Sequence, residues 1–500
     1  MEDSSKSQHE NMQRIQLQEV DLSENPKDIM VELRSDLVDK LRAGSTIEVT
    51  GVLRSTPLNK GSLMGVKYIL AHSILVIDEE ALKTVVSEEE AIQVRALCDS
   101  LDFRERLDYL IWSWSGHLLC SPLLKRALFL QAVGSPEESK FGHRSGIHIL
   151  IAGDPGTVKT HLLRAMRNLV LGSRMVSAEA ASQAGLVAAC QQVEDLYTGK
   201  KRWALTPGAL ALTPKEATCC VDELNLYKYP LSDVNTALES GKVYKTTGPV
   251  KGILDAPAAI LAGANPMAGD QKKFVTGKGM GFLGQLGFDR PELQRWDLIY
   301  VLLDQAEYDR DFDIAMSVMG SGKNTSSAVN LDFVQKYVAL SKKVNPIMTE
   351  EAITFIATQH ANKRSIEVDE HLRSHRLVVA LQRLALATAR FDFAERVTLE
   401  HVEFAQRVFA QSINESDPGL LTTGIDKASR QRNSKTESLV AALMDTKSSI
   451  AKLSGVEGKE IREHLKANSV LFDNNTDFNS AMRRLPFLTA SGSKWIYEEA

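Results

Sequence analysis

The sequence has few cysteines, no long apolar run and no excess of positive charge. Its 500 residues contain five cysteines, without a CxxC pair or the spacing of metal ligands, which favours reduced thiols over a disulfide framework or a zinc site. It has no signal peptide, lipidation motif or membrane-length apolar segment, so secretion and membrane insertion are not expected. Because the formal net charge is −5, any contact with nucleic acid must come from local lysines and arginines.

Apolar periodicity divides the chain into a β-rich start, an α/β centre and helical regions. Alternation in RIQLQEV, DIMVELR, STIEVTGVLR and VKYILAHSILVI predicts half-buried strands and a small β-barrel or sandwich. Strands that alternate with helices predict a parallel sheet in the centre. The expected order is a disordered start (1–13), a β domain (14–86), a helical connector (87–135), an α/β core (136–328), a helical region (329–413), a linker (414–434) and a winged helix (435–500).

The stretch IHILIAGDPGTVKTHL has the layout of a phosphate-binding loop between a buried strand and a helix. In such loops backbone N–H groups hold phosphates, a lysine reaches the β- and γ-oxygens, and a hydroxyl binds Mg²⁺. Lys159 and Thr160 take the last two roles, so ATP and Mg²⁺ are the expected ligands. The candidate nucleotide-binding residues are Gly153, Asp154, Pro155, Gly156, Thr157, Val158, Lys159, Thr160 and His161. Val158 stands where a glycine normally precedes the lysine.

Two further strands end in polar residues that would complete a site for nucleotide hydrolysis. The strand in CCVDE is followed by two acids, of which Asp222 would support Mg²⁺ and Glu223 would orient the attacking water. The strand in AAILAGAN ends at Asn265, whose amide can hydrogen-bond the γ-phosphate or the water. A strand followed by a charged turn, and a common Asn-Pro turn, are the alternative interpretations of these two segments.

Arg295 precedes the last strand of the core, DLIYVLLD, and is expected at the edge of the domain. An arginine there could reach the ATP of a neighbouring subunit and stabilise charge on the transferring phosphoryl group. The alternative is a surface salt bridge to Asp297 or Glu292, and position alone does not separate the two.

In order and spacing, GDPGTVKTHLL, CCVDEL, AGANP and LQRWDLIYVLLD resemble the AAA+ core of the minichromosome maintenance (MCM) replicative helicases. The resemblance covers nearly the whole chain from Arg14 onward. Segments 184–189 and 202–210 resemble the helix-2 insert, 337–352 and 376–390 resemble the helical lid, and 28–78 resembles later strands of an oligonucleotide-binding (OB) barrel. It implies an α/β multidomain protein: a AAA+ P-loop core with a helical lid, preceded by a partial OB-type β-barrel and followed by a winged helix.

The same resemblance assigns catalytic roles in addition to those of the phosphate loop. Asp222 and Glu223 match the Walker B acids, and Asn265 matches the sensor-1 asparagine. Arg295 matches the arginine finger that acts in trans on a neighbouring subunit. Arg376 matches the sensor-2 arginine of the lid, although the residues beside it differ from the usual sequence of the family.

The chain departs from the family pattern at three places. Residues Leu224–Tyr227 are Leu-Asn-Leu-Tyr where the family usually has Phe-Asp-Lys-Met. The finger motif is Gln-Arg-Trp-Asp instead of Ser-Arg-Phe-Asp, with the arginine kept. The helical subdomain and cysteine zinc module that the family carries near its N-terminus are missing, so the barrel is expected to start midway. Val158, by contrast, resembles the small non-glycine residue that the family has before its lysine.

Lysines on two predicted hairpins are the candidate DNA contacts. They are Lys242, Lys245 and Lys251 in GKVYKTTGPVKG, which resembles the presensor hairpin of the family, and Lys60 and Lys67 beside a hairpin of the barrel. A ring translocase needs such positive charge facing its channel. The usual DNA-contacting lysine of the family aligns with Thr247, so Lys245 is expected to take its role. Lysines on solvated hairpins are the alternative interpretation.

These features predict an ATPase that forms a hexameric ring, alone or with related MCM subunits, and unwinds DNA in replication. Single-stranded and duplex DNA are the expected partners, with Arg483, Arg484 and Lys494 of the winged helix as possible duplex contacts. No targeting signal is seen, so an archaeal or mobile-element protein would lie at the nucleoid in the cytoplasm and a eukaryotic one in the nucleus. Two alternatives are a truncated homologue that binds ATP and DNA without unwinding, and a AAA+ ATPase that remodels proteins.

Overall fold

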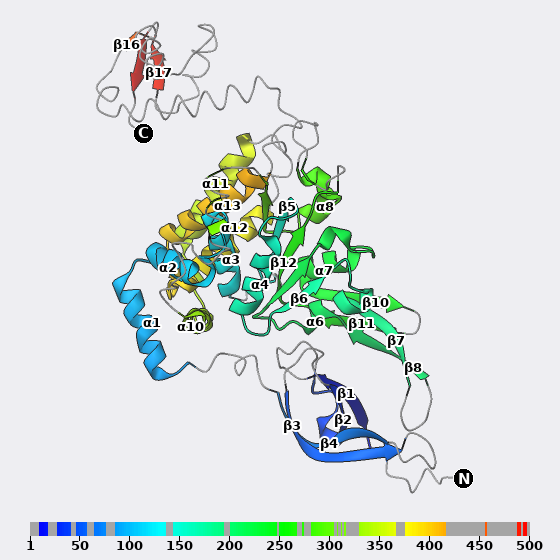
Figure 1. Ribbon diagram of the computed structural model, residues 1–500. Coiled ribbons are helices and arrows are strands. Elements are labelled where there is room, and N and C mark those ends of the chain that lie inside the picture. The colour runs from blue at the N-terminus through cyan, green and yellow to red at the C-terminus, as the bar shows by residue number, and fades with distance from the viewer. Residues whose placement is uncertain are drawn as a thin grey trace. The chain divides into compact units, whose positions relative to one another are not determined.

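In a computed structural model, the chain forms two compact units, Met1–Pro418 and Gly419–Ala500. The structure describes residues 10–18, 28–41, 47–57, 65–76, 86–136, 144–194, 201–247, 250–267, 273–274, 282–304, 308, 312, 315–316, 330–366, 376–416, 456–457, 488–491 and 494–497. Figure 1 shows the elements coloured along the chain from blue to red.

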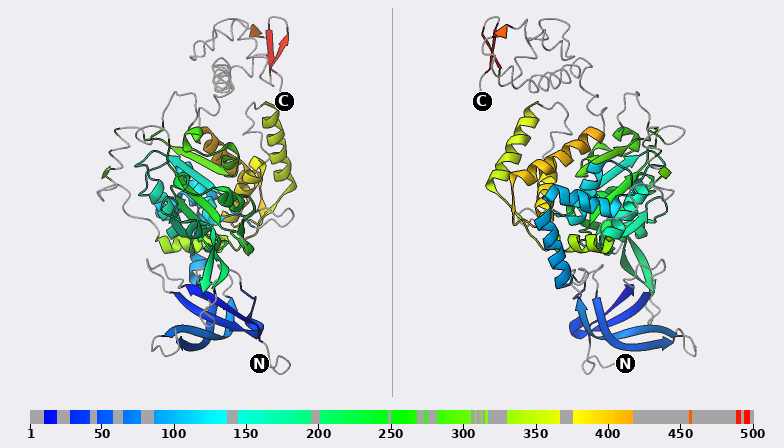
Figure 2. Two further views of the ribbon diagram at one scale, coloured as in Figure 1. Left: turned by 90° about the vertical axis from the view of Figure 1, so that its right-hand side faces the viewer. Right: turned by 60° about the vertical axis from the view of Figure 1, so that its left-hand side comes forward.

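The β-rich start of the chain forms a four-stranded sheet in the order β1-β2-β4-β3. The strands are β1 (Met12–Gln18), β2 (Asp28–Arg34), β3 (Ile47–Pro57) and β4 (Gly65–Val76), close to the four segments that alternation predicts. The long strands β3 and β4 bend (Figure 2), and their register shifts at a bulge between Thr50 and Gly51. A Cβ on Gly51 would lie 2.3 Å from the carbonyl oxygen of Leu70, so the bulge requires glycine.

A buried acid of this sheet is paired with two arginines. Glu32 lies between the fully buried side chains of Val31 and Leu33, and its carboxylate is 1% exposed. Arg14 on β1 lies 3.3 Å from one carboxylate oxygen and Arg34 lies 2.7 Å from the other. A buried charge is tolerated when it is paired and hydrogen-bonded, so the two arginines satisfy Glu32.

Three helices follow the sheet: α1 (Glu88–Ser100), α2 (Phe103–Ser115) and α3 (Pro122–Val133). A capping box starts α1: Ser87 accepts from the N–H of Glu90, whose carboxylate accepts from the N–H of Ser87. Asp102 caps α2 by accepting from two backbone N–H groups. Apolar residues of α2 and α3 join the same hydrophobic core as the central sheet and the later helices. These helices therefore share the main core of the molecule.

The centre of the molecule is a five-stranded parallel sheet in the order β13-β5-β12-β9-β6. Its strands are β5 (Ile149–Gly153), β6 (Arg174–Ser177), β9 (Thr218–Asp222), β12 (Ala259–Ala264) and β13 (Leu298–Leu302). Every residue of β5 and β12 is buried, as expected of strands covered on both faces. The predicted parallel sheet is confirmed, and the carboxyl ends of its strands share one edge.

Two antiparallel hairpins adjoin each other beside this sheet (Figure 1): β7 (Ala188–Glu194) with β8 (Lys201–Pro207), and β10 (Lys242–Thr247) with β11 (Val250–Asp255). Short helices α5 (Gln183–Leu186) and α6 (Ala209–Leu212) flank the first, and α7 (Ser232–Ser240) leads into the second. A Cβ on Gly208 would lie 2.6 Å from backbone atoms of Ala184, Leu186 and Val187, so the start of α6 can pack against α5 only with glycine there.

The lid has four helices in the described residues: α10 (Leu331–Ser341), α11 (Glu350–Ile366), α12 (Arg376–Phe391) and α13 (Leu399–Ser416). A two-residue parallel pair, β14 (Ile347–Met348) with β15 (Arg396–Val397), joins the segments that precede α11 and α13. Helices α12 and α13 pack together against α3, and α13 also contacts β13 (Figure 1). The lid therefore shares its core with the sheet.

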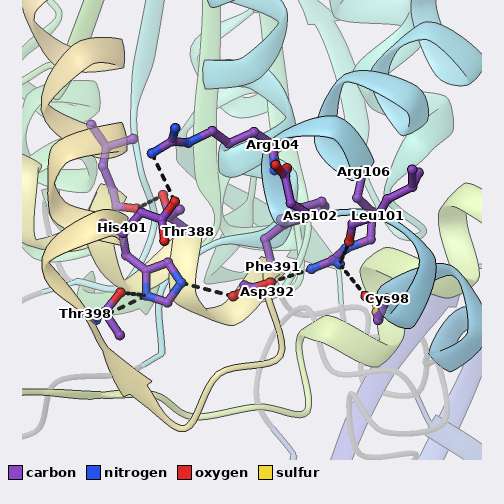
Figure 3. A network of polar contacts seen from close by, with 12 residues as sticks. Cys98, Leu101, Asp102, Arg104, Arg106, Thr388, Phe391, Asp392, Thr398 and His401 are labelled. Carbon is purple, nitrogen blue, oxygen red and sulfur yellow. Dashed lines mark hydrogen bonds and ion pairs between the residues drawn. The ribbon is translucent and has the colours of Figure 1, made fainter.

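A polar network holds the early helices on the lid (Figure 3). Arg106 of α2 donates to the hydroxyl of Tyr337 at 2.8 Å, to two carbonyls at the end of α1 and to the carboxylate of Asp392. The second oxygen of Asp392 lies 3.1 Å from Nε2 of His401 on α13. Burial raises the pKa of Tyr337 well above its usual value, so the hydroxyl stays neutral and donates to the carbonyl of Phe391 at 2.9 Å.

The described part of the C-terminal unit is a small antiparallel sheet in the order β16-β18-β17. Its strands are β16 (Val456–Glu457), β17 (Leu488–Ser491) and β18 (Lys494–Tyr497). The predicted linker beyond Ser416 and the helices of the predicted winged helix lie outside the described residues. No described helix has the length and apolar character needed to cross a membrane.

Candidate active site

The phosphate-loop sequence forms the turn between β5 and α4 (Lys159–Leu169). Gly156 has φ +82°, and a Cβ there would meet nothing within 4 Å, so its backbone angle alone requires glycine. Val158 has a negative φ of −68°, so its backbone does not require the glycine that normally precedes the lysine. Gly153 is crowded, because a Cβ would lie 2.9 Å from Oγ1 of Thr157.

Lys159 points back into the loop. Its ammonium donates to the carbonyls of Gly153 at 2.8 Å and Asp154 at 2.7 Å, and to Oγ1 of Thr157 at 2.9 Å. Burial lowers the pKa of Lys159 to about 8, and the nearby carboxylates of Asp222 and Asp154 oppose that shift. The ammonium is therefore held at the loop by three neutral oxygens, and a phosphate group would supply the negative charge that favours its protonated form.

Asp154 was expected among the nucleotide contacts, but its buried carboxylate binds backbone. One oxygen accepts from the N–H of Phe274 at 2.7 Å and the other from the N–H of Asp304 at 2.9 Å. The N–H of Asp154 donates to the carbonyl of Leu302, the last residue of β13. The side chain of Asp154 therefore fastens the loop to the neighbouring strand. Pro155 and the side chain of His161 are exposed.

Thr160 and Asp222 come together at the carboxyl edge of the sheet. Oγ1 of Thr160 donates to a carboxylate oxygen of Asp222 at 2.8 Å. The other oxygen of Asp222 accepts from the N–H of Glu223 at 3.1 Å. Glu223 has the left-handed backbone values φ 56° and ψ 41°, uncommon for a residue other than glycine and frequent at functional sites. The turn directs the chain away from the strand directly after the first acid.

Asn265 lies at the end of the strand between β5 and β9. Its N–H donates to Oδ1 of Asn225 at 3.2 Å, and its carbonyl accepts from Nδ2 of Asn225 at 2.6 Å. Asn225 belongs to the segment after β9 in which the sequence departs from the family pattern. Its side chain therefore links the carboxyl ends of two neighbouring strands, β9 and β12. The side-chain Oδ1 of Asn265 is buried and has no hydrogen-bond partner among the described residues. A buried amide oxygen of this kind is costly unless a ligand or water satisfies it.

These residues fit a nucleotide with Mg²⁺. The first turn of α4 has N–H groups without intrahelical partners, the space beside Gly156 is open, and a buried ammonium lies at the loop. Thr160 and Asp222 supply the two adjacent oxygens that a hard cation prefers, and phosphate oxygens and water would complete its ligands. Bound Mg²⁺ would neutralise charge on the phosphates.

Arg295 lies at the opposite edge of the sheet from this loop. Leu298 at the start of β13 pairs with Ile149, and Leu302 at its end pairs with Gly153. At about 3.3 Å per residue, the length of β13 separates its start from the loop by roughly 13 Å. Arg295 precedes the strand by three further residues, beyond the reach of an arginine side chain to its own loop. This position supports a role in trans.

The side chain of Arg295 is paired, but with neither of the two acids expected from sequence. Its Nε lies 3.3 Å from Oε2 of Glu239, at the end of α7, and another nitrogen donates to the carbonyl of Pro291 at 2.6 Å. Arg376, at the start of α12, donates to the other oxygen of Glu239 at 2.8 Å. The two arginines predicted to be catalytic therefore meet on one carboxylate.

Asp297 of the finger motif lies in a buried ion cluster. Arg144 binds one of its carboxylate oxygens at 2.8 Å and Arg383 of α12 binds the other at 2.7 Å. Burial raises the pKa of Asp297, but the two arginines outweigh it and hold the pKa well below its usual range. Arg144 also donates to the carbonyl of Arg295 at 3.2 Å, and Arg383 donates to the carbonyl of Arg144 at 3.0 Å. The cluster thus fixes the backbone of the finger against the lid.

Trp296 explains the second departure in the finger motif. Its side chain is buried and packs edge-on against His148, with ring centroids 6.4 Å apart. Burial and the nearby Arg144 hold the pKa of His148 well below its usual value, so its Nδ1 can accept from the N–H of Ile260 at 2.9 Å. A tryptophan at this place fills the core and leaves the arginine beside it at the surface.

Two of the predicted DNA-binding lysines lie on opposite faces of strand β10 in the β10–β11 hairpin. Successive side chains of a strand alternate in direction, so Lys245 lies on the face of fully buried Val243. Its ammonium contacts the carboxylate of Asp233 on α7, and its side chain is 11% exposed. Lys242 is exposed and shares the other face with Tyr244, which is 48% exposed.

The remaining candidates are scattered. Lys251 pairs with Thr246 in the hairpin register, and Lys67 is exposed on β4 opposite Ser55. Lys494 begins β18. Lys60, Arg483 and Arg484 lie outside the described residues.

Models of protein families match most of the chain. An MCM OB domain covers residues 1–57, an MCM P-loop domain covers 95–321, and an MCM AAA-lid domain covers 332–413. The chain belongs to the MCM family. The P-loop match includes the end of α1 and all of α2 and α3, in agreement with their place in the common core of this MCM protein.

Known relatives are distant. The chain is 28% identical over 447 residues to the minichromosome maintenance protein MCM of Saccharolobus solfataricus, covering 85% of this chain and 63% of the relative. It is 25% identical over 522 residues to the DNA replication licensing factor MCM4 of Drosophila melanogaster, covering 96% and 58%. An uncharacterized MCM-type protein of Methanocaldococcus jannaschii is 27% identical over 493 residues, covering 94% and 69%. The chain thus spans less than two thirds of the length of the first two.

Three features of the site were not foreseen. Asn225 and Glu239 carry no motif of their own, and their partners lie 40 or more residues away along the chain. Asp297 was considered only as a surface partner of Arg295. One signal was available for Lys245: its place two residues from apolar Val243 in a strand pattern predicts the same, inner face.

Proposed function

We propose that this protein is an ATP-dependent DNA translocase or helicase of the MCM type that acts in replication, with ATP hydrolysed between subunits of a hexameric ring. The proposal is carried mainly by the division of one site over two edges of the sheet. The Thr160–Asp222 pair lies at the carboxyl edge, and Arg295 lies beyond reach at the other. A neighbouring copy, or a related MCM subunit, would supply the missing arginine.

The proposed chemistry follows from the contacts. Lys159 would turn from the loop carbonyls to the β- and γ-phosphates, and Thr160 with Asp222 would hold Mg²⁺. Glu223 would orient the attacking water, and the unsatisfied Oδ1 of Asn265 would accept a hydrogen from that water. Arg295 and Arg376 of a neighbour would stabilise the charge that develops on the transferring phosphoryl group.

For DNA, the contacts favour Lys242 over Lys245 as the main cation of the β10–β11 hairpin. Lys242 is exposed, whereas Lys245 is already paired with Asp233. Lys67 and Lys251 would add further charge along a single strand. We also propose that the C-terminal unit is a winged helix, supported by the antiparallel strands that match its predicted wing. The protein would act at the nucleoid or in the nucleus.

The decisive experiment is steady-state ATP hydrolysis by the purified protein, with and without single-stranded DNA, beside an Arg295→Ala variant. Under the proposal, DNA stimulates hydrolysis, and the variant loses activity by a factor of about 10³ or more, the usual contribution of an arginine finger. Hydrolysis that ignores DNA and responds to a protein partner would favour remodelling of proteins. Hydrolysis near background in every sample would favour a homologue that binds ATP and DNA without unwinding.

A further inference from the structure

Three elements that are distant in sequence converge on one carboxylate. Glu239 is the penultimate residue of α7, Arg295 follows α8 (Arg290–Leu293), and Arg376 begins α12. The two oxygens of Glu239 are divided between the arginines, at 3.3 Å and 2.8 Å. Without this acid two guanidinium groups would face each other with like charge. Glu239 is therefore what allows them to lie side by side.

The backbones that carry the arginines are fixed independently of Glu239. The carbonyl of Arg295 is held by Arg144, and α12 is held seven residues after Arg376 by Arg383, which binds Asp297. The direction of the two long side chains is set by their other partners, which include Glu239 for both and the carbonyl of Pro291 for Arg295. Glu239 and Arg376 are each about half exposed, at 50% and 48%. Exposed ion pairs add little to stability, so the stability of the fold does not account for this arrangement.

We propose that Glu239 is a positioning residue for hydrolysis in trans: it aligns Arg295 and Arg376 as a pair for the phosphates bound by the neighbouring subunit. This inference rests on the proposed function. A neutral or missing side chain at 239 leaves both arginines in place along the chain but lets them diverge. A small misplacement of a catalytic group can cost about 100-fold in rate, so Glu239→Ala is expected to lower ATP hydrolysis by roughly 10- to 100-fold.

A subunit-mixing experiment tests whether this loss acts across the interface. Glu239→Ala subunits keep an intact phosphate loop, and Lys159→Ala subunits keep intact arginines. In a random equal mixture, about a quarter of head-to-tail interfaces combine the good loop of one with the good arginines of the other. The mixture should then hydrolyse ATP at about a quarter of the wild-type rate, above either variant alone. A mixture no more active than the average of the two variants would overturn the inference.

Two comparisons separate positioning from structural damage. Glu403→Ala, at an exposed position of α13, should keep wild-type activity. Adding Glu239→Ala to the Arg295→Ala/Arg376→Ala double variant should change the rate less than about twofold, since the groups act as one unit. A further tenfold loss in that background would refute positioning through the arginines. Wild-type protein without ATPase activity would defeat the proposed function itself, whereas an active wild type with an equally active Glu239→Ala variant defeats only this inference.

Discussion

Replacing Asp297 by asparagine removes the one negative charge that two buried arginines share. Arg144 and Arg383 have side chains only 7% and 11% exposed, and both bind the carboxylate at less than 3 Å. The asparagine amide can accept from only one of them, and its NH₂ group faces the other donor. Removing one partner of a buried ion pair costs about 3–5 kcal/mol, because the remaining charge stays buried without compensation. We expect Asp297→Asn to lose stability in that range.

The assay is thermal unfolding followed by tryptophan fluorescence, which includes buried Trp296 beside the cluster. For a compact unit of about 400 residues the midpoint falls by about 1 °C per kcal/mol, so it should fall by roughly 3 to 5 °C. Asp289→Asn, at an exposed position in the same segment, is the matched control and should leave the midpoint unchanged. A fall of less than about 2 °C in Asp297→Asn would mean that the cluster does not hold the finger segment, and the reasoning would be refuted.

The pH dependence of the stability is an independent test of whether the charge of Asp297 stabilises the folded protein. The pKa of Asp297 in the folded protein is well below its usual range, near 3.9 in the unfolded chain. The unfolded chain therefore binds the proton first, and the stabilisation is fully present above about pH 5 and is lost as the pH falls through the acid range. The wild type should lose stability on acidification more steeply than Asp297→Asn. Equal slopes for the two proteins would contradict the ion cluster as its source.

Three further outcomes are expected. Because the pKa of Lys159 is lowered to about 8 and phosphates favour its charged form, ATP binding should take up a proton near pH 8, and the affinity should fall above that pH. Calorimetry in buffers of different ionisation enthalpy measures the proton uptake. An affinity for ATP that is constant to pH 10 would contradict this prediction. Val158→Gly should bind ATP like the wild type, whereas Gly156→Ala, strained at φ +82°, should bind more weakly; equal affinities would show that the loop adapts. Lys242→Ala should weaken binding to single-stranded DNA and lower the salt dependence of that binding by about one charge, as measured by fluorescence anisotropy. Lys245→Ala should mainly loosen the hairpin, because Lys245 pairs with Asp233. A larger loss of DNA affinity in Lys245→Ala than in Lys242→Ala would restore Lys245 as the contact.

Local sequence patterns were enough to predict those strands and loops whose structure depends on residues close together in the chain. Alternation located the four N-terminal strands, and the apolar run before Gly153 located the buried strand and its loop. The acids after β9 and the asparagine after β12 could then be placed near this loop, because the carboxyl ends of parallel strands share one edge of the sheet.

Partners far apart in the chain could not be predicted in this way. Nothing in the sequence around Glu239 distinguishes it from any acid at the end of an exposed helix, and its two arginines follow 56 and 137 residues later. The role of Asp297 depended on burial, which turned a presumed surface partner of Arg295 into the centre of the cluster that holds its backbone. Burial and long-range pairing are decided by tertiary packing, and periodicity reports only which face of an element is apolar.

Under the proposed function, the two edges of the sheet also dictate how copies can associate. The loop edge carries Lys159, Thr160 and Asp222, and the other edge carries Arg295 with Arg376 on Glu239. A two-fold dimer buries the same patch of both copies, so pairing loop edges or arginine edges with each other completes no site. A head-to-tail contact brings one of each together, and such contacts close into a ring or continue as a filament. A catalytically active assembly of this chain must therefore place the loop edge of one copy against the arginine edge of another, and a dimer that pairs two loop edges or two arginine edges should be inactive.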